Sequence, residues 1–175
     1  MKKIFKAELT HITHFIFDVD GVMTDGTVSI DANGELIRTM NVKDGYALKT
    51  ALNHGYGIAI ITGGTNQGVK DRLQALGIKD IFLGAHDKDR VLQEYLEDYD
   101  VNPKHCLYMG DDLPDLTAMK RCHIATCPQD AVPEIKAQVD YVSHLAGGKG
   151  CVRDVIEQVL KVNGHWNHDS ETTSA

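Results

Sequence analysis

Short apolar runs alternate with amphipathic stretches along most of the chain. The runs end in turn or polar residues, as buried strands do, and they cover residues 14–20, 57–63, 80–85, 105–111 and 122–127. Between and after them, apolar residues recur at spacings of three and four over 44–55, 65–77, 87–99, 113–121 and 151–162. This is the period of an amphipathic helix. The alternation predicts an α/β fold with a Rossmann-like, mostly parallel sheet and helices on both faces.

One segment departs from this alternation. Residues 26–40 read GTVSIDANGELIRTM, with β-branched residues on both sides of Asn33-Gly34, and this pattern predicts a β-hairpin over about 26–41. A lone hairpin is marginally stable in water, so its apolar side chains need a partner. That partner is either the same chain or another subunit, and a decorative edge hairpin remains an alternative. The apolar residues are Val28, Ile30, Leu36, Ile37 and Met40.

The length of 175 residues fits one domain, and neither repeats nor an interdomain linker interrupt it. We therefore expect a single domain over 1–175. A polar segment, NGHWNHDSETTSA, follows the last predicted helix and indicates a flexible tail over about 164–175.

Composition narrows the class of protein. The contents of 42% apolar and 25% charged residues are typical of a soluble globular chain, and no apolar run approaches the length of a membrane span. The basic start lacks the long apolar stretch of a secretion signal, so a cytoplasmic location is expected. The net charge of −7 argues against nucleic acid as the main partner. The four cysteines form no CxxC pair and are expected to be buried, reduced thiols.

Candidate chemistry gathers where the predicted strands end. Asp18 and Asp20 follow the first strand, and residues two apart in a strand point to the same face, so two like charges meet there. Ligands of an open parallel sheet lie beyond the carboxyl ends of its strands. Thr62-Gly63, Lys88 and Asp111-Asp112 belong to that same edge. Each of these residues alone has an ordinary alternative, as a helix cap or a solvated charge.

Together these residues predict a metal-assisted site. Carboxylate oxygens suit Mg²⁺, which binds through one or two carboxylates and substrate phosphate. One aspartate of the first pair can then attack phosphorus while its neighbour moves a proton. The hypothesis at this point is phosphoryl transfer to an aspartate.

Four motifs in this order resemble those of haloacid dehalogenase (HAD) superfamily phosphatases: DVDGVMTDG at 18–26, IITGG at 60–64, Lys88, and GDDLPD at 110–115. Three further stretches, NVKDGYALK at 41–49, LGI at 76–78 and AGGKGCVRDV at 146–155, are similar to 3-deoxy-D-manno-octulosonate 8-phosphate (Kdo-8-phosphate) phosphatases. The resemblance extends over about 10–162. It implies a HAD-like fold without a large cap domain, and a homotetramer in which the hairpin builds the central contact and neighbouring subunits help to close the site. The implied reaction is the Mg²⁺-dependent hydrolysis of Kdo-8-phosphate, a small phosphorylated sugar acid of lipopolysaccharide biosynthesis.

The resemblance also implies roles for individual residues. Asp18 would be the nucleophile that becomes an aspartyl phosphate, and Asp20 would be general acid and then general base. Thr62, with backbone N–H groups near Gly63, would hold the phosphoryl oxygens. Lys88 would offset the charge between Asp18 and the phosphate.

The implied magnesium ligands are the Asp18 carboxylate, the Asp20 backbone carbonyl and the Asp111 carboxylate. Asp112 and Asp115 would orient the metal from behind these ligands.

Two positions depart from the resembled family. Gly64 stands where relatives commonly carry arginine after the TG of the second motif, and Lys149 stands in a loop often written GGRG. Both positions bear on the anionic sugar acid, so Gly63, Gly64 and Lys149 are the expected substrate contacts. A capless site leaves the loop 147–150, with Lys149, as the natural partner of the remote carboxylate.

Three other functions remain open from the sequence. The substrate can be the nine-carbon analogue, 2-keto-3-deoxynononate 9-phosphate. A non-catalytic HAD-like oligomerisation module is a second alternative, which the intact set of motif residues disfavours. A response-regulator receiver domain is a third, and the order of Thr62 and Lys88 before the second acidic pair disfavours it.

Overall fold

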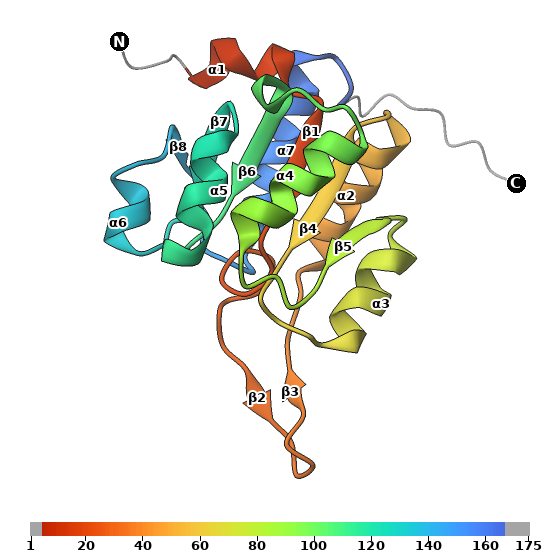
Figure 1. Ribbon diagram of the computed structural model, residues 1–175. Coiled ribbons are helices and arrows are strands. Elements are labelled where there is room, and N and C mark those ends of the chain that lie inside the picture. The colour runs from red at the N-terminus through yellow and green to blue at the C-terminus, as the bar shows by residue number, and fades with distance from the viewer. Residues whose placement is uncertain (1–4, 167–175) are drawn as a thin grey trace, which may run out of the picture.

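The computed structural model describes residues 5–166, and its centre is a parallel sheet. The sheet has six strands in the order β5-β4-β1-β6-β7-β8, and every neighbouring pair is parallel (Figure 1). The strands are β1 His14–Phe17, β4 Gly57–Ile61, β5 Asp80–Phe82, β6 Cys106–Met109, β7 Ile124–Cys127 and β8 Tyr141–Val142. The predicted fold class is confirmed, and all five predicted strands are present.

Helices cover both faces of this sheet (Figure 1). The helices α2 Val42–Asn53, α3 Gln67–Ala75 and α7 Cys151–Val162 pack on one face, and α4 Lys88–Asp98 and α5 Leu116–Arg121 pack on the other. Shorter pieces complete the described chain: α1 Phe5–Glu8, α6 Pro133–Lys136 and the 3₁₀ turns η1 Leu9–His11, η2 Pro103–His105 and η3 Leu113–Asp115.

The apolar sequence of the central strand β1 is explained by its cover on both faces. Phe15 and Phe17 are fully buried against the α2 and α7 layer, and Ile16 is fully buried against the α4 and α5 layer. Side chains of a strand alternate between its faces, so a strand covered on both sides has to be apolar at every position. The first polar residue, Asp18, comes where this cover ends, and its N–H donates to the Met109 carbonyl at 3.2 Å.

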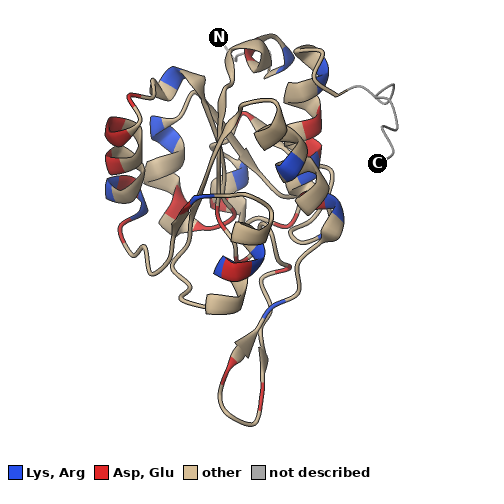
Figure 2. Ribbon diagram, turned by 90° about the vertical axis from the view of Figure 1, so that its right-hand side faces the viewer, with Lys and Arg blue, Asp and Glu red and all other residues tan. Residues whose placement is uncertain are grey.

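The predicted hairpin is present and projects from the body of the molecule (Figure 1). Its strands are short, β2 Ser29–Ile30 and β3 Leu36–Ile37, and they pair antiparallel. Gly34 takes a positive φ of 80°, as the expected turn requires. Most of the hairpin ribbon is neither acidic nor basic (Figure 2). Met40 packs against the core, but Val28, Ile30, Leu36 and Ile37 stay exposed, Ile30 to 71%. This chain alone therefore buries only part of the apolar surface of the hairpin.

Some elements were not predicted. The two-residue strand β8 and the four-residue helices α1 and α6 are too short to show a period. The first residues of the predicted tail contact the body of the protein. Trp166 is buried against the Tyr46 ring, and His165 shares a hydrogen bond with the Tyr56 hydroxyl. Flexibility of the tail stays a prediction. The rest of that segment lies outside the described residues.

Two further expectations can be compared with the structure. All four cysteines are free and buried, as predicted. Among residues 5–166, no helix combines the length and the apolar character that crossing a membrane requires.

Candidate active site

The predicted chemical residues meet at the carboxyl edge of the sheet. A cavity of about 470 Å³ lies there, beyond the ends of β1, β4 and β6. Nearly all predicted site residues line it: Asp18, Asp20, Thr62, Gly63, Gly64, Lys88, Asp111, Asp112 and Asp115. His86 and Pro114 line the same cavity and were not predicted. Lys149 is the one predicted residue that lines a different cavity.

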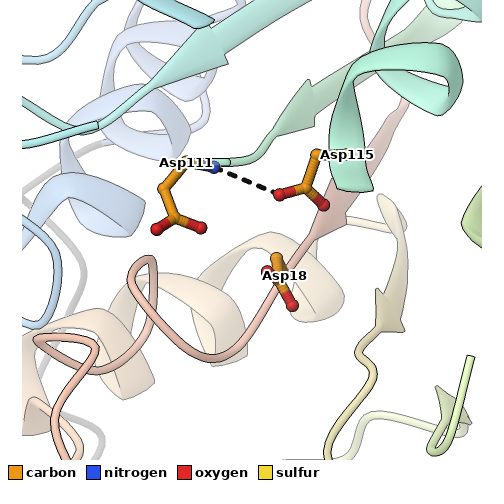
Figure 3. A group of neighbouring side chains, drawn as sticks. All are labelled: Asp18, Asp111 and Asp115. Atoms are coloured by element: carbon orange, nitrogen blue, oxygen red, sulfur yellow. Dashed lines mark hydrogen bonds between the residues drawn. The ribbon is translucent and has the colours of Figure 1, made fainter. Parts of the chain in front are cut away.

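Three aspartates form the acidic centre of this cavity. One carboxylate oxygen from each of Asp18, Asp111 and Asp115 lies within 4.8 Å of the other two, and Figure 3 shows the three side chains together. The three side chains come from the end of β1, the end of β6 and η3, so the fold brings together residues nearly a hundred positions apart. Gly21 makes room for this approach: a Cβ atom there would lie 2.0 Å from the Asp111 Oδ2.

Both carboxylate oxygens of Asp115 accept hydrogen bonds. Its Oδ1 accepts from the Tyr108 hydroxyl at 3.0 Å and from the Lys88 ammonium at 2.8 Å. Its Oδ2 accepts from the Asp111 N–H at 3.2 Å, the bond that Figure 3 shows. The carboxylate is 1% exposed. Asp115 therefore orients Asp111 and Lys88. Asp18 is held as well, because its Oδ1 accepts from the Val19 N–H at 2.7 Å.

Lys88 supplies the counter-charge. Its Nζ lies 2.9 Å from the Asp18 Oδ2 as well as contacting Asp115, and the side chain is buried. Burial by itself lowers the pKa of a lysine, but the charges of Asp18 and Asp115 outweigh it, so the Lys88 pKa is raised and the ammonium form is secured.

One ammonium group does not neutralise this cluster. Burial, followed by repulsion from Asp115, raises the pKa of Asp18 to about 6. Burial, followed by repulsion from Asp18 and Asp115, raises the pKa of Asp111 to about 7. Carboxylates that resist ionisation in this way are stabilised by a bound cation. A hard divalent cation with oxygen ligands, such as Mg²⁺, therefore fits Asp18 and Asp111.

Asp20 lines the cavity but stands apart from the acidic centre. Its Oδ1 accepts from Arg38 Nε at 2.6 Å and its Oδ2 accepts from Arg38 Nη2 at 3.0 Å. Arg38 lies on the hairpin and was missed as a site residue. The signal was present in the sequence, since Arg38 is the only basic residue between Gly26 and Met40.

Thr62 lies at the end of β4 and faces the same cavity. It is 3% exposed, and its Oγ1 accepts from the Gly64 N–H at 3.2 Å. At Gly63 an added Cβ would meet nothing within 4 Å, so the backbone is open on that side. Hydroxyl and N–H donors beside a lysine are suited to the oxygens of a phosphoryl group.

Comparisons with known proteins agree with this arrangement. A family model for haloacid dehalogenase-like hydrolases matches residues 41–128. The 3-deoxy-D-manno-octulosonate 8-phosphate phosphatase KdsC of Salmonella typhi is 38% identical, over 91% of this chain and 84% of its own. The KdsC of Escherichia coli strain K12 is also 38% identical, over 92% and 85%. This chain belongs to the KdsC family of haloacid dehalogenase-like hydrolases.

Solved structures of KdsC proteins share the fold. The Yersinia pestis phosphatase superposes with a TM-score of 0.89 at 32% identity, covering 91% of this chain and 86% of its own. The Moraxella catarrhalis phosphatase, solved in complex with magnesium ion, phosphate ion and KDO, superposes with a TM-score of 0.86 at 34% identity, covering 89% and 90%. Membership of this family rules out the receiver-domain alternative.

The two positions at which this chain departs from the resembled pattern differ in placement. Gly64 lines the catalytic cavity, and an added Cβ would lie 3.4 Å from Arg38 Nη2. Lys149 lines a separate cavity of about 570 Å³ together with Lys43 and Arg153. A contact between Lys149 and the substrate therefore stays a prediction, and a single chain does not bring Lys149 into the phosphate cavity.

The glycine loop at 147–150 has a structural task as well. A Cβ at Gly147 would lie 2.1 Å from the Gly21 carbonyl oxygen, and one at Gly148 would lie 2.7 Å from the Asp25 nitrogen. The loop thus packs directly on the backbone that follows Asp20, and Gly148 N–H donates to the Val22 carbonyl at 3.0 Å.

Proposed function

We propose that this protein is an Mg²⁺-dependent phosphatase that hydrolyses 3-deoxy-D-manno-octulosonate 8-phosphate to 3-deoxy-D-manno-octulosonate and phosphate. The observation that carries the proposal is the cavity in which Lys88 contacts Asp18 beside the acidic centre. Relatives with 38% identity are named as phosphatases of this ester, and a similar structure holds magnesium, phosphate and the sugar acid.

The first half of the reaction transfers the phosphoryl group to the chain. The Asp18 carboxylate attacks phosphorus, an Asp–O–P bond forms, and the bond from phosphorus to the sugar oxygen breaks. Asp20, in its protonated form, gives its proton to the leaving sugar oxygen, and the carboxylate that results is the form that accepts from Arg38. Thr62 and the N–H groups around Gly63 hold the phosphoryl oxygens, and Lys88 offsets their charge.

The second half releases phosphate. A water molecule attacks phosphorus, Asp20 takes its proton, and the Asp18–phosphorus bond breaks, so both aspartates return to their starting forms. The carboxylates of Asp18 and Asp111 and the backbone carbonyl of Asp20 are the groups that would hold Mg²⁺, with Asp112 and Asp115 behind them. When bound there, Mg²⁺ supplies positive charge that offsets the phosphoryl oxygens.

We extend the proposal to assembly and location. The whole chain would act as one phosphatase domain within a homotetramer, held by the exposed apolar side chains of the hairpin. Its four free, buried cysteines suit a reducing compartment, so the enzyme would work in the cytoplasm, in the supply of lipopolysaccharide precursors.

Phosphate release from a panel of esters tests this function. Purified protein with Mg²⁺ should hydrolyse Kdo-8-phosphate with a higher kcat/KM than glucose 6-phosphate, and excess EDTA should abolish turnover. A preference for 2-keto-3-deoxynononate 9-phosphate would move the assignment to the nine-carbon acid. No turnover of any ester would favour the non-catalytic oligomerisation module.

A further inference from the structure

Arg38, on the hairpin, places a buried positive charge beside Asp20 of the active site. The Arg38 side chain is 8% exposed, although it belongs to the hairpin that projects from the body of the molecule. Its guanidinium meets Asp20, which lies eighteen positions earlier, through the two parallel hydrogen bonds described above. A guanidinium keeps its charge throughout the pH range in which proteins are folded.

The Leu36 carbonyl links Arg38 to Asn66 on the body of the protein. Its Nη1 donates to the Leu36 carbonyl at 3.1 Å, and the Asn66 Nδ2 donates to the same carbonyl at 3.0 Å. Asn66 also caps α3, because its Oδ1 accepts from the Val69 N–H at 2.9 Å. The root of the hairpin is therefore fastened to the body of the protein where Arg38 lies.

The contact also determines where the Asp20 carboxyl group points. Its two oxygens are both engaged, so the side chain has one orientation, and in that orientation it lines the cavity with Asp18 and Thr62. The same orientation leaves Asp20 out of the group formed by Asp18, Asp111 and Asp115.

We propose that Arg38 is a positioning residue for the phosphatase reaction, which holds the Asp20 carboxyl group toward the phosphate cavity and out of the acidic centre. The inference rests on the proposed function of this site. Two parallel bonds to a planar guanidinium fix both the position and the plane of a carboxyl group, which a single ammonium contact does not do. A displacement of about 1 Å at a reacting group can cost about a hundredfold in rate.

Gly64 is part of the same arrangement. An added Cβ would lie 3.4 Å from Arg38 Nη2 and 3.5 Å from the Asp20 Oδ2. Glycine therefore leaves the space that the guanidinium and carboxylate pair fills beside Thr62. A large side chain at position 64 should displace this pair.

A double-mutant cycle tests the proposal. Arg38→Met should lower kcat on Kdo-8-phosphate by about 10- to 100-fold with KM changed by less than about threefold, because substrate binding does not use Arg38. Arg38→Lys should recover part of the loss. In an Asp20→Asn background, Arg38→Met should cost less than about twofold more, since its partner is already disabled. Arg72→Met, which removes an arginine that lines the cavity beside the hairpin root, should leave kcat unchanged.

Multiplicative losses in the cycle would overturn the proposal, because they would mean that Arg38 acts independently of Asp20. A crystal structure of Arg38→Met with Mg²⁺ gives a readout that needs no turnover, and the Asp20 side chain should leave its present orientation. An unmoved Asp20 would also overturn it. If Arg38→Met does not fold, the kinetic cycle and the crystal structure can both be obtained with Arg38→Lys and Arg38→Gln.

Failure of the proposed substrate is a separate result. The cycle can be run on any ester that the wild-type protein hydrolyses, such as p-nitrophenyl phosphate, so a wrong sugar leaves the Arg38 test intact. If wild-type protein hydrolyses no ester, the proposed function fails, and the crystal structures still decide whether Arg38 positions Asp20.

Discussion

The Lys88 ammonium group lies 2.9 Å from the Asp18 Oδ2 and 2.8 Å from the Asp115 Oδ1, and all three side chains are buried. A single cation thus joins the proposed nucleophile to the carboxylate that orients Asp111. Two buried carboxylates depend on it, so this relationship affects the stability of the protein as well as its chemistry.

Lys88→Met should therefore lose both activity and stability. Removal of one partner from a buried ionic group leaves uncompensated charge, which typically costs about 3–5 kcal/mol. Urea unfolding at pH 7 measures the free energy of unfolding, and Lys120→Met, an exposed lysine on α5, is the matched control. A stability loss equal to that of the control would show that Asp18 and Asp115 do not rely on Lys88.

Asp18→Asn should abolish turnover while the protein still folds. The amide is nearly isosteric with the carboxylate but is a poor nucleophile, and enzymes accelerate phosphate ester hydrolysis by factors of up to about 10²¹. Single-turnover assays should show no phosphoryl-enzyme, and far-UV circular dichroism checks the fold. More than about a tenth of the wild-type rate would remove Asp18 from the nucleophile role.

Asp44 should make the protein less stable at neutral pH than at mildly acidic pH. It lies in the first turn of α2, and its Oδ1 accepts from the Arg153 N–H at 2.8 Å. Among the described residues no donor reaches its buried Oδ2. Burial, only partly offset by Arg153, raises the Asp44 pKa from 3.8 to about 6.

The sign follows from linkage. The folded pKa of Asp44 exceeds the unfolded pKa, so its contribution to stability is fully present below about pH 4 and is lost as the pH rises through about 6. The difference in unfolding free energy between wild type and Asp44→Asn should change by about 2 kcal/mol between pH 4 and pH 7.5, in favour of the variant at the higher pH. Urea titrations at several pH values measure it. Asp98→Asn, at an exposed position on α4, is the matched control, and a change for Asp44→Asn no larger than that of the control would contradict the prediction.

Substitutions in the hairpin should break the proposed tetramer. Val28 and Ile30 are 42% and 71% exposed, so lysine at both positions disturbs few contacts within one chain. Charges placed in an apolar contact between subunits should shift the protein toward monomers, which light scattering detects. Activity on Kdo-8-phosphate should fall too, because Arg38 lies on the same hairpin. Wild-type protein that is already monomeric would rule out the assembly.

Lys149→Ala should distinguish recognition of the sugar acid from recognition of the phosphate group. If Lys149 meets the remote carboxylate, with help from the assembly, its loss should raise KM for Kdo-8-phosphate by the equivalent of about 1–2 kcal/mol. Hydrolysis of a small aryl phosphate, which lacks that carboxylate, should hardly change. Equal losses on both substrates would place the effect of Lys149 in the loop that packs on Gly21 and Asp25 rather than in substrate recognition.

The sequence by itself determined the sheet, the hairpin and the proposed chemistry. The apolar runs, and the recurrence of apolar residues every three or four positions, indicate which residues face the core. Asn33-Gly34 indicates a turn. These features can be predicted because they depend on neighbours within a few positions. The position of Asp18, Thr62, Lys88 and Asp111 at strand ends and helix starts brings them to one edge for the same reason, once the strands are parallel. Short elements such as β8 and α6 carry too few residues to show a period.

Only the tertiary structure decided which partner each side chain of the site contacts. Local spacing does not reveal that the Asp115 oxygens accept from Tyr108, Lys88 and the Asp111 N–H, so that Asp115 orients the groups beside it. Nor does it reveal that Arg38 folds back from an exposed hairpin onto Asp20, or that Lys149 lines a separate cavity. Such contacts join residues from distant parts of the chain, and their energies come from burial and charge in three dimensions, which no pattern of nearby residues records.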